Sequence, residues 1–351
     1  MQFNNKNIID KLTEGEFLNH EEWMILLGEL SDDDQSYLHE KAAEVARMHF
    51  GNGIFVRALL EISSYCRNNC YYCGIRCGNK NAQRYRLSKE EILECCKEGN
   101  ILGFNTFVLQ GGEDPHQTDE WIVDIVKSIR QAYPDKAITL SVGERSHEAY
   151  LAFKEAGANR FLLRHETRND DHYLQLHPSS MSAEKRRDCL MTLKHLGFQT
   201  GSGMMIGSPG QTDEYLYEDI RFLEHLQPEM IGIGPFIPAS NTPFENCSAG
   251  SAEKTTLIIS LLRLRFQKAL IPATTALSSL CHNGMEQAIL AGANVVMPNI
   301  SPAEQRKKYS IYNNKKSTGA ESAQQMQQLE ERLNAIGYHI NYDRGDYNTF
   351  Y

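Results

Sequence analysis

The chain has 351 residues, of which 41% are hydrophobic, and its formal net charge is −9. This length allows either one barrel or two ordinary domains with substantial cores. An acidic chain lacks the cationic surface that nucleic-acid backbones require, so we expect no nucleic-acid partner.

Residues 1–11 are polar, and no apolar run reaches the length of about eighteen residues that spans a bilayer. We therefore expect neither secretion nor a membrane anchor, but a cytoplasmic protein. Nine cysteines are an odd number, and four of them crowd between Cys66 and Cys77. This distribution favours metal ligation in a reducing compartment over a disulfide framework.

Two helices are predicted near the N-terminus. One begins at Asn19 or His20, and Ser31, which precedes acidic residues, is a suitable cap for the second. We interpret residues 1–50 as an N-terminal helical extension. Residues 51–351 then form the main domain with a C-terminal closing segment.

Beyond the extension, short apolar runs alternate with longer segments of helical period, such as Ser88–Leu102 and Trp121–Tyr133. This order is typical of repeated βα units around a parallel sheet. The pattern predicts an α/β fold, a (βα)8 TIM-type barrel whose strand C-terminal ends form the active-site mouth. The predicted strands lie near residues 54–62, 105–110, 137–142, 160–164, 200–206, 230–236, 271–275 and 294–298.

Three closely spaced cysteines, Cys66, Cys70 and Cys73, follow the first predicted strand. Iron–sulfur clusters commonly have four cysteine ligands and zinc sites four cysteine or histidine ligands, so three thiolates leave one position to explain. An open iron would bind a cofactor or substrate. The alternative is a structural zinc site with Cys77 or a histidine as the fourth ligand.

The CxxxCxxC spacing, with Tyr72 directly before the third cysteine, resembles the signature of the radical S-adenosylmethionine (SAM) superfamily. The resemblance implies that Cys66, Cys70 and Cys73 hold one 4Fe-4S cluster whose open iron binds SAM. It also implies an enzyme that generates a 5′-deoxyadenosyl radical. In such an enzyme the cofactor supplies the chemistry, and the protein orients it.

The segment after the second predicted strand, Gly111-Gly112-Glu113, resembles the superfamily's GGE motif, which binds the amino group of SAM. Glycines permit close approach of a ligand to the backbone. A lone Gly-Gly-Glu equally fits a turn between a strand and a helix.

Polar groups also follow the third and fourth predicted strands. Ser141 and Glu166 are expected to help hold SAM, and Arg186 to pair with its carboxylate. The alternative for these charges is an internal Arg–Glu ion pair at the barrel rim. Further along, Thr274 and Thr275 offer hydroxyls and turn amides to an anion, or else form a β-branched pair in a strand.

Five longer strings extend the resemblance beyond the superfamily signature: LQGGEDP (109–115), LLRHET (162–167), GIGPFIP (232–238), IPATTA (271–276) and GANVVMPN (292–299). They resemble the HydE family of FeFe-hydrogenase maturases over roughly residues 20–345. The resemblance implies a maturase that acts on a small sulfur-containing iron complex, together with other maturases and an electron donor. It implies substrate binding by Arg164, Thr274, Thr275 and Tyr309.

Two departures from that family stand out. No cysteine follows Cys281, so we expect no accessory cluster; Gln305 replaces the first of two cavity tyrosines, whereas Tyr309 matches the second. Three alternatives remain open: a methylornithine synthase-like mutase, a biotin synthase-like enzyme, and a non-catalytic cluster scaffold.

Overall fold

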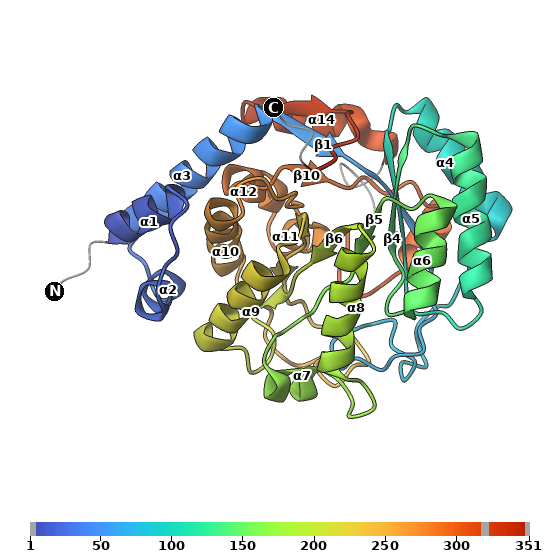
Figure 1. Ribbon diagram of the computed structural model, residues 1–351, viewed down its shortest axis with the longest axis horizontal. Helices are drawn as coiled ribbons and strands as arrows, with labels where there is room; N and C mark the ends of the chain where they lie inside the picture. The colour runs from blue at the N-terminus through green and yellow to red at the C-terminus, as the bar shows by residue number, and fades with distance from the viewer. Residues whose placement is uncertain (1–4, 317–322, 348–351) are drawn as a thin grey trace.

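The computed structural model describes residues 5–316 and 323–347, and helices surround a ring of parallel strands (Figure 1). The helices are α1 Asn5–Thr13, α2 His20–Leu27, α3 Asp32–Phe50, α4 Lys89–Ile101, α5 Asp119–Ala132, α6 His147–Ala156, α7 Asp170–Leu176, α8 Ala183–His195, α9 Asp213–Leu226, α10 Ala252–Arg265, α11 Thr275–Leu280, α12 Gly284–Leu290, α13 Ala303–Lys308 and α14 Met326–Ala335. The strands are β1 Gly53–Val56, β2 Ala58–Ser63, β3 Thr106–Gly111, β4 Ala137–Ser141, β5 Arg160–Leu162, β6 Gln199–Ser202, β7 Met205–Ile206, β8 Met230–Ile231, β9 Gly234–Pro235, β10 Val295–Val296 and β11 His339–Asn341.

The strands form the predicted TIM-type barrel. Strands β2, β3, β4, β5, β6 and β8 pair in that order, all in parallel. Backbone hydrogen bonds of the segment around residues 270–273 and of β10 close the ring back to β1. These bonds run from Ile231 N to Leu270 O, from Ala273 N to Val295 O and from Arg57 N to Val296 O.

The segment predicted as a strand at 271–275 occupies a strand's place in the ring, but the structure corrects its extent. This segment makes only isolated bridges at Leu270 and Pro272, and a helix begins at Thr275. The apolar run was too short to separate a strand from the start of a helix by periodicity alone. The single strand predicted at 54–62 is also divided, into β1 and β2.

The predicted N-terminal helices are present, and their caps follow the sequence signals. Asn19 forms a capping box with Glu22, and the Ser31 side chain accepts a hydrogen bond from Asp34 N. Helix α3 packs on α10, where His39 Nδ1 lies 2.8 Å from Ser260 Oγ. The division of the chain at residue 50 stays a prediction.

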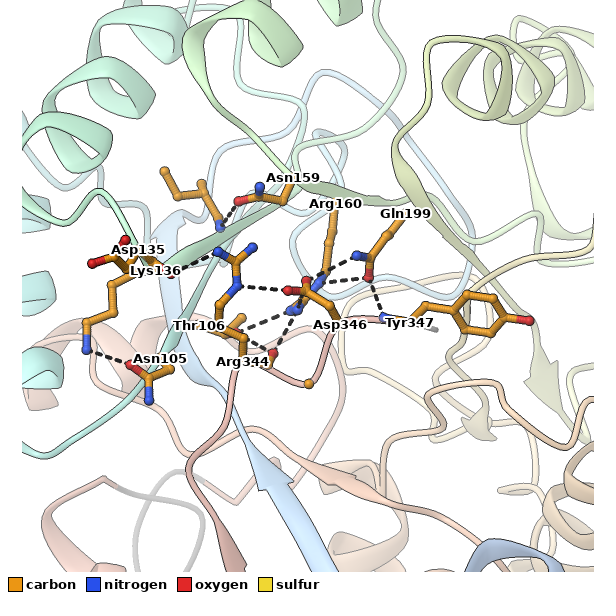
Figure 2. Close-up of polar contacts among 12 residues, drawn as sticks. Asn105, Thr106, Asp135, Lys136, Asn159, Arg160, Gln199, Arg344, Asp346 and Tyr347 are labelled. Carbon is orange, nitrogen blue, oxygen red and sulfur yellow. Dashed lines mark hydrogen bonds and ion pairs between the residues drawn. The ribbon is translucent and has the colours of Figure 1, made fainter. Parts of the chain in front are cut away.

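The C-terminal segment lies against the N-terminal end of the barrel (Figure 2). Arg160, at the start of β5, is fully buried and donates to Asp346 Oδ1 at 2.6 Å and to the Arg344 carbonyl at 2.7 Å. It also donates to Thr106 Oγ1 and Gln199 Oε1, both at 3.2 Å. The chain itself therefore satisfies this buried guanidinium.

Within the described part of the chain, no helix has the length and apolar character required to cross a bilayer.

Candidate cluster and cofactor site

Cys66, Cys70 and Cys73 are half-buried in the loop that follows β2. The Arg84 guanidinium holds this loop together, because it donates hydrogen bonds to four of its carbonyls, those of Ser64, Ile75, Arg76 and Asn79. One side chain thus fixes backbone on both sides of the cysteines. The loop is built to hold its three thiols in place rather than to swing freely.

The strand end after β3 is fastened to the cysteine loop. Asp114 is buried, accepts from Ser63 Oγ at 2.6 Å and binds both the Nε and Nη2 of Arg86. A Cβ at Gly112 would lie 2.7 Å from Cys66 Cβ and 2.2 Å from the Tyr65 carbonyl. Only glycine permits this approach. The predicted GGE motif and the cysteines therefore form one packed unit.

Burial raises the pKa of the Cys66 and Cys70 thiols, and it raises the pKa of Cys73 to about 12. Neighbouring thiols act in the same direction, since Cys73 adds to the effect on Cys70 and Cys66 to that on Cys73. Thiolates need a nearby cation to persist in such an environment. Iron ions would supply that charge, so these residues fit a cluster.

The described residues offer no group of three or more His, Cys, Asp and Glu side chains close enough to share one metal ion. A structural zinc site needs four such ligands around a single ion. In a four-iron cluster each cysteine binds a different iron, so its ligands need not converge on one point. Three cysteines on one loop are therefore enough to bind three irons of such a cluster.

Tyr72 points its hydroxyl at His177, whose Nε2 lies 3.1 Å away. The His177 ring stacks on Tyr173 at 4.0 Å, and Cys70 Sγ lies 3.9 Å from the sulfur of Met181. The sequence analysis did not identify His177, Tyr173 or Met181. All three come from α7 and the turn after it, and no motif marks them.

The two arginines predicted at the site each lie beside a carboxylate. Arg186 Nε is 3.0 Å from Glu144 Oε1, and Arg164 Nη2 is 3.0 Å from Glu166 Oε2. Neither contact has hydrogen-bond geometry, and Arg186 Nε, Arg164 Nη2 and Glu166 Oε2 are buried without a hydrogen-bond partner among the described residues. Ion pairs at the rim are therefore present, but they leave bonding capacity that a ligand would use.

Glu166 lies deep at this rim, and its backbone has a left-handed φ of 66°. A non-glycine residue in this conformation needs support from its surroundings. Glu166 N donates to the Gly203 carbonyl at 3.1 Å, and the neighbouring His165 ring contacts Ser202 and Asp219. The fold thus holds the Glu166 carboxylate in a strained position at the mouth.

Glu113 is already engaged within the chain. Its Oε2 accepts from Arg67 Nε at 3.1 Å, and its Oε1 accepts from Glu144 N at 2.9 Å. Ser141, at the end of β4, is half-buried and lies opposite Gln110 in the sheet register. Gly111 ends β3 against Ser63 of β2.

The predicted substrate-binding residues lie on two other elements. Thr274 precedes helix α11, and its Oγ1 is buried without a hydrogen-bond partner in the described structure; Thr275 begins that helix. Tyr309 is 3% exposed, and its hydroxyl lies 3.5 Å from Gln110 Nε2. Gln110 belongs to the barrel wall, so Tyr309 reaches the same interior that the strand ends surround.

Comparison with known proteins agrees with this geometry. Residues 60–223 match the family model described as Radical SAM superfamily. The chain is 42% identical over 310 residues to the [FeFe] hydrogenase maturase subunit HydE of Thermotoga maritima, covering 88% of this chain and 87% of that protein. It is 32% identical to 3-methylornithine synthase of Methanosarcina acetivorans, covering 82% and 81%. A crystal structure of methylornithine synthase (PylB) superposes with a TM-score of 0.86 at 28% identity, covering 97% of this chain and 98% of that one.

Proposed function

This chain belongs to the radical SAM superfamily, within the group that includes HydE, and we propose that it is a maturase of FeFe-hydrogenase. The observation that carries the proposal is the 42% identity to HydE over 88% of the chain. The packing of Gly112 against Cys66 supports it, because this contact joins the cysteine loop to the strand end that would hold SAM.

Members of the superfamily are enzymes that use a 4Fe-4S cluster and SAM. When both are bound, an electron from the cluster cleaves SAM and releases a 5′-deoxyadenosyl radical. In this chain Cys66, Cys70 and Cys73 would hold the cluster, and the absence of cysteines after Cys281 supports a single one.

The rim residues would orient SAM. Arg186, with Nε near Glu144 but not hydrogen-bonded, would bind the SAM carboxylate. Glu166 and Ser141 would accept from its ammonium or ribose hydroxyls. Tyr72 would stay fixed through His177, at 3.1 Å, and so keep the cysteine loop in register with the cofactor.

A small sulfur-containing iron complex is the proposed substrate, received from another hydrogenase maturase. Thr274, Thr275, Tyr309 and Arg164 would bind its anionic groups. An external electron donor would reduce the cluster. Because Gln305 replaces a tyrosine of the family pattern, the substrate pocket would differ locally from that of HydE.

The test is a maturation assay. Reconstituted chain, added under anaerobic conditions to a mixture of apo-hydrogenase and all other maturation components, is expected to restore H2 production. Cys66→Ala should abolish this activity, and the matched variant Cys247→Ala should retain it. The proposal fails if the wild-type chain cleaves SAM normally but no hydrogenase becomes active.

Methylornithine synthase activity is the second candidate, because this chain is 32% identical to that enzyme. Incubation with SAM, dithionite and lysine distinguishes the two. The maturase proposal predicts no methylornithine.

A further inference from the structure

One buried ion pair inside the barrel has no part in the roles assigned so far. Lys315 Nζ lies 2.6 Å from Glu61 Oε1, and their side chains are 10% and 0% exposed. Glu61 belongs to β2. Ala58 of the same strand packs outward on Gly99 of α4, and side chains alternate along a strand, so Glu61 faces the barrel interior.

The sheet register shows how far along the barrel axis this ion pair lies. Glu61 is opposite Gln110 of β3, and Gln110 is opposite Ser141 of β4. Lys315 Nζ lies 5.4 Å from the centre of the Tyr309 ring, and Tyr309 contacts Gln110. The Lys315 ammonium therefore shares one layer of the interior with Ser141 and Tyr309, which are proposed to bind cofactor and substrate.

Lys315 reaches this layer from a segment that crosses the barrel mouth. The Ile311 carbonyl accepts from Gly74 N at 2.9 Å, directly after Cys73, and Asn313 N donates to the Pro238 carbonyl at 3.0 Å. Lys316 N donates to Ser279 Oγ of α11 at 3.3 Å. The segment thus links the cysteine loop to α11, and Lys315 descends between them.

Stability does not explain an ion pair at this position. Desolvation of two charges commonly offsets their attraction, so apolar residues of similar size would fill a barrel interior at least as well. Burial also raises the pKa of Glu61, which Lys315 only partly counteracts. A second, independent observation points to a ligand: the buried Thr274 hydroxyl before α11 has no hydrogen-bond partner in the described structure.

We propose that Lys315 is an anion-binding residue of the substrate cavity and that Glu61 holds its ammonium in place until the substrate's anionic group arrives. The chemical class is a small molecule with a carboxylate or comparable anion. This inference rests on the proposed function, since it names one contact of that substrate. The proposal predicts opposite effects of the two residues on substrate affinity. The Lys315 ammonium attracts the anionic group, whereas the Glu61 carboxylate competes with that group for the ammonium.

The experiment uses L-cysteine as probe and measures its affinity for the reconstituted, SAM-bound chain by anaerobic calorimetry. Lys315→Met should weaken L-cysteine binding by about 10-fold or more, as expected for loss of a charge-assisted hydrogen bond. Glu61→Gln should strengthen it, because the competing carboxylate is gone. Lys315→Arg should restore most of the affinity, and the adjacent variant Lys316→Met should behave as wild type.

Cysteamine, which lacks the carboxylate, should bind the wild type and Lys315→Met equally. SAM affinity, measured on the same samples, should be unchanged and shows that the variants are folded. The proposal is overturned if L-cysteine binds neither protein, if Lys315→Met binds it as well as wild type, or if Glu61→Gln and Lys315→Met both weaken it. Failure of the hydrogenase assay alone would overturn the proposed function and leave this contact standing.

Discussion

Arginines lie at both ends of the barrel, but their hydrogen bonding differs. At the N-terminal end, Arg160 donates to four oxygens of its own chain, and the segment that carries Asp346 covers it (Figure 2). At the mouth, Arg164 and Arg186 lie beside carboxylates without hydrogen-bond geometry at Nη2 and Nε. Arg160 is therefore a structural tie, whereas Arg164 and Arg186 each keep a nitrogen without a hydrogen-bond partner, although Arg186 Nη1 donates to the Arg164 carbonyl at 3.0 Å.

This difference indicates where ligands bind. Buried polar groups are expensive unless hydrogen-bonded, and unsatisfied nitrogens occur at both ends, since Arg57 Nε and Arg344 Nε at the N-terminal end also have no hydrogen-bond partner in the described structure. The groups at the mouth differ because they lie where a ligand of this fold would bind. TIM-type barrels place their chemistry at the C-terminal ends of the strands and use the opposite end for stability. Substitutions at the N-terminal end should therefore change unfolding, whereas substitutions at the mouth should change ligand affinity.

The largest expected effect is on stability. Asp346→Asn leaves the buried Arg160 without its carboxylate, which should lower the free energy of unfolding by about 3–5 kcal/mol. Urea denaturation at neutral pH measures this change. SAM affinity of the folded variant should stay at the wild-type value. A loss of SAM affinity would contradict the claim that the N-terminal end serves stability and not ligand binding.

The same variant carries a pH test. Burial raises the pKa of Asp346, but Arg160, together with Arg344 and Gln199, outweighs burial and leaves the pKa below its usual value. The pair's contribution is then fully present above the unfolded pKa of about 3.9 and is lost as pH falls through the folded value. The stability gap between wild type and Asp346→Asn should therefore narrow in acid. A constant gap would contradict the assignment.

A smaller effect is expected at the mouth. Arg186→Met removes the guanidinium proposed to bind the SAM carboxylate, which should weaken SAM binding by about 10–100-fold. Calorimetry on the reconstituted protein gives the affinity, and iron content should not change. Arg187→Met, one residue along α8, removes a contact to Asp170 instead and serves as the matched control. Equal affinities for SAM in both variants would assign Arg186 to the internal ion pair alone.

The smallest effect concerns His172, behind the mouth. Burial lowers its pKa, and its ring lies 3.1 Å from Thr167 Oγ1 and 3.2 Å from the Pro209 carbonyl. The unfolded chain binds a proton near pH 6.5 that the native ring resists, so stability should fall as pH drops below that value. His172→Gln should reduce this slope. A His172→Gln variant with the same slope as wild type would contradict this account.

The cysteine loop and the barrel were predictable because each depends on local patterns. Spacing alone put Cys66, Cys70 and Cys73 on one loop, and alternating periods predicted the βα units. The C-terminal end of the strand at 271–275 was predicted wrongly, because a short apolar run before Thr275 fits a strand and a helix start equally well.

Other parts of the site depend on contacts between distant segments. His177 meets Tyr72 across 105 positions of sequence, and Lys315 meets Glu61 only because the chain returns over the mouth. Lys315 lies in a polar stretch that has no periodicity, so nothing local distinguishes it from a solvated lysine. Lys315 is identified by its burial and by the strand register of its partner Glu61, and a single sequence contains neither kind of information.

The most direct measurement is SAM cleavage by the reconstituted chain with dithionite. The wild type is expected to bind about four irons and to release 5′-deoxyadenosine. Cys66→Ala should lose the cluster and the product, while Cys281→Ala should keep both. A protein that holds only zinc, or a Cys66→Ala variant that cleaves SAM as fast as wild type, would contradict the assignment of the mouth as a radical SAM site.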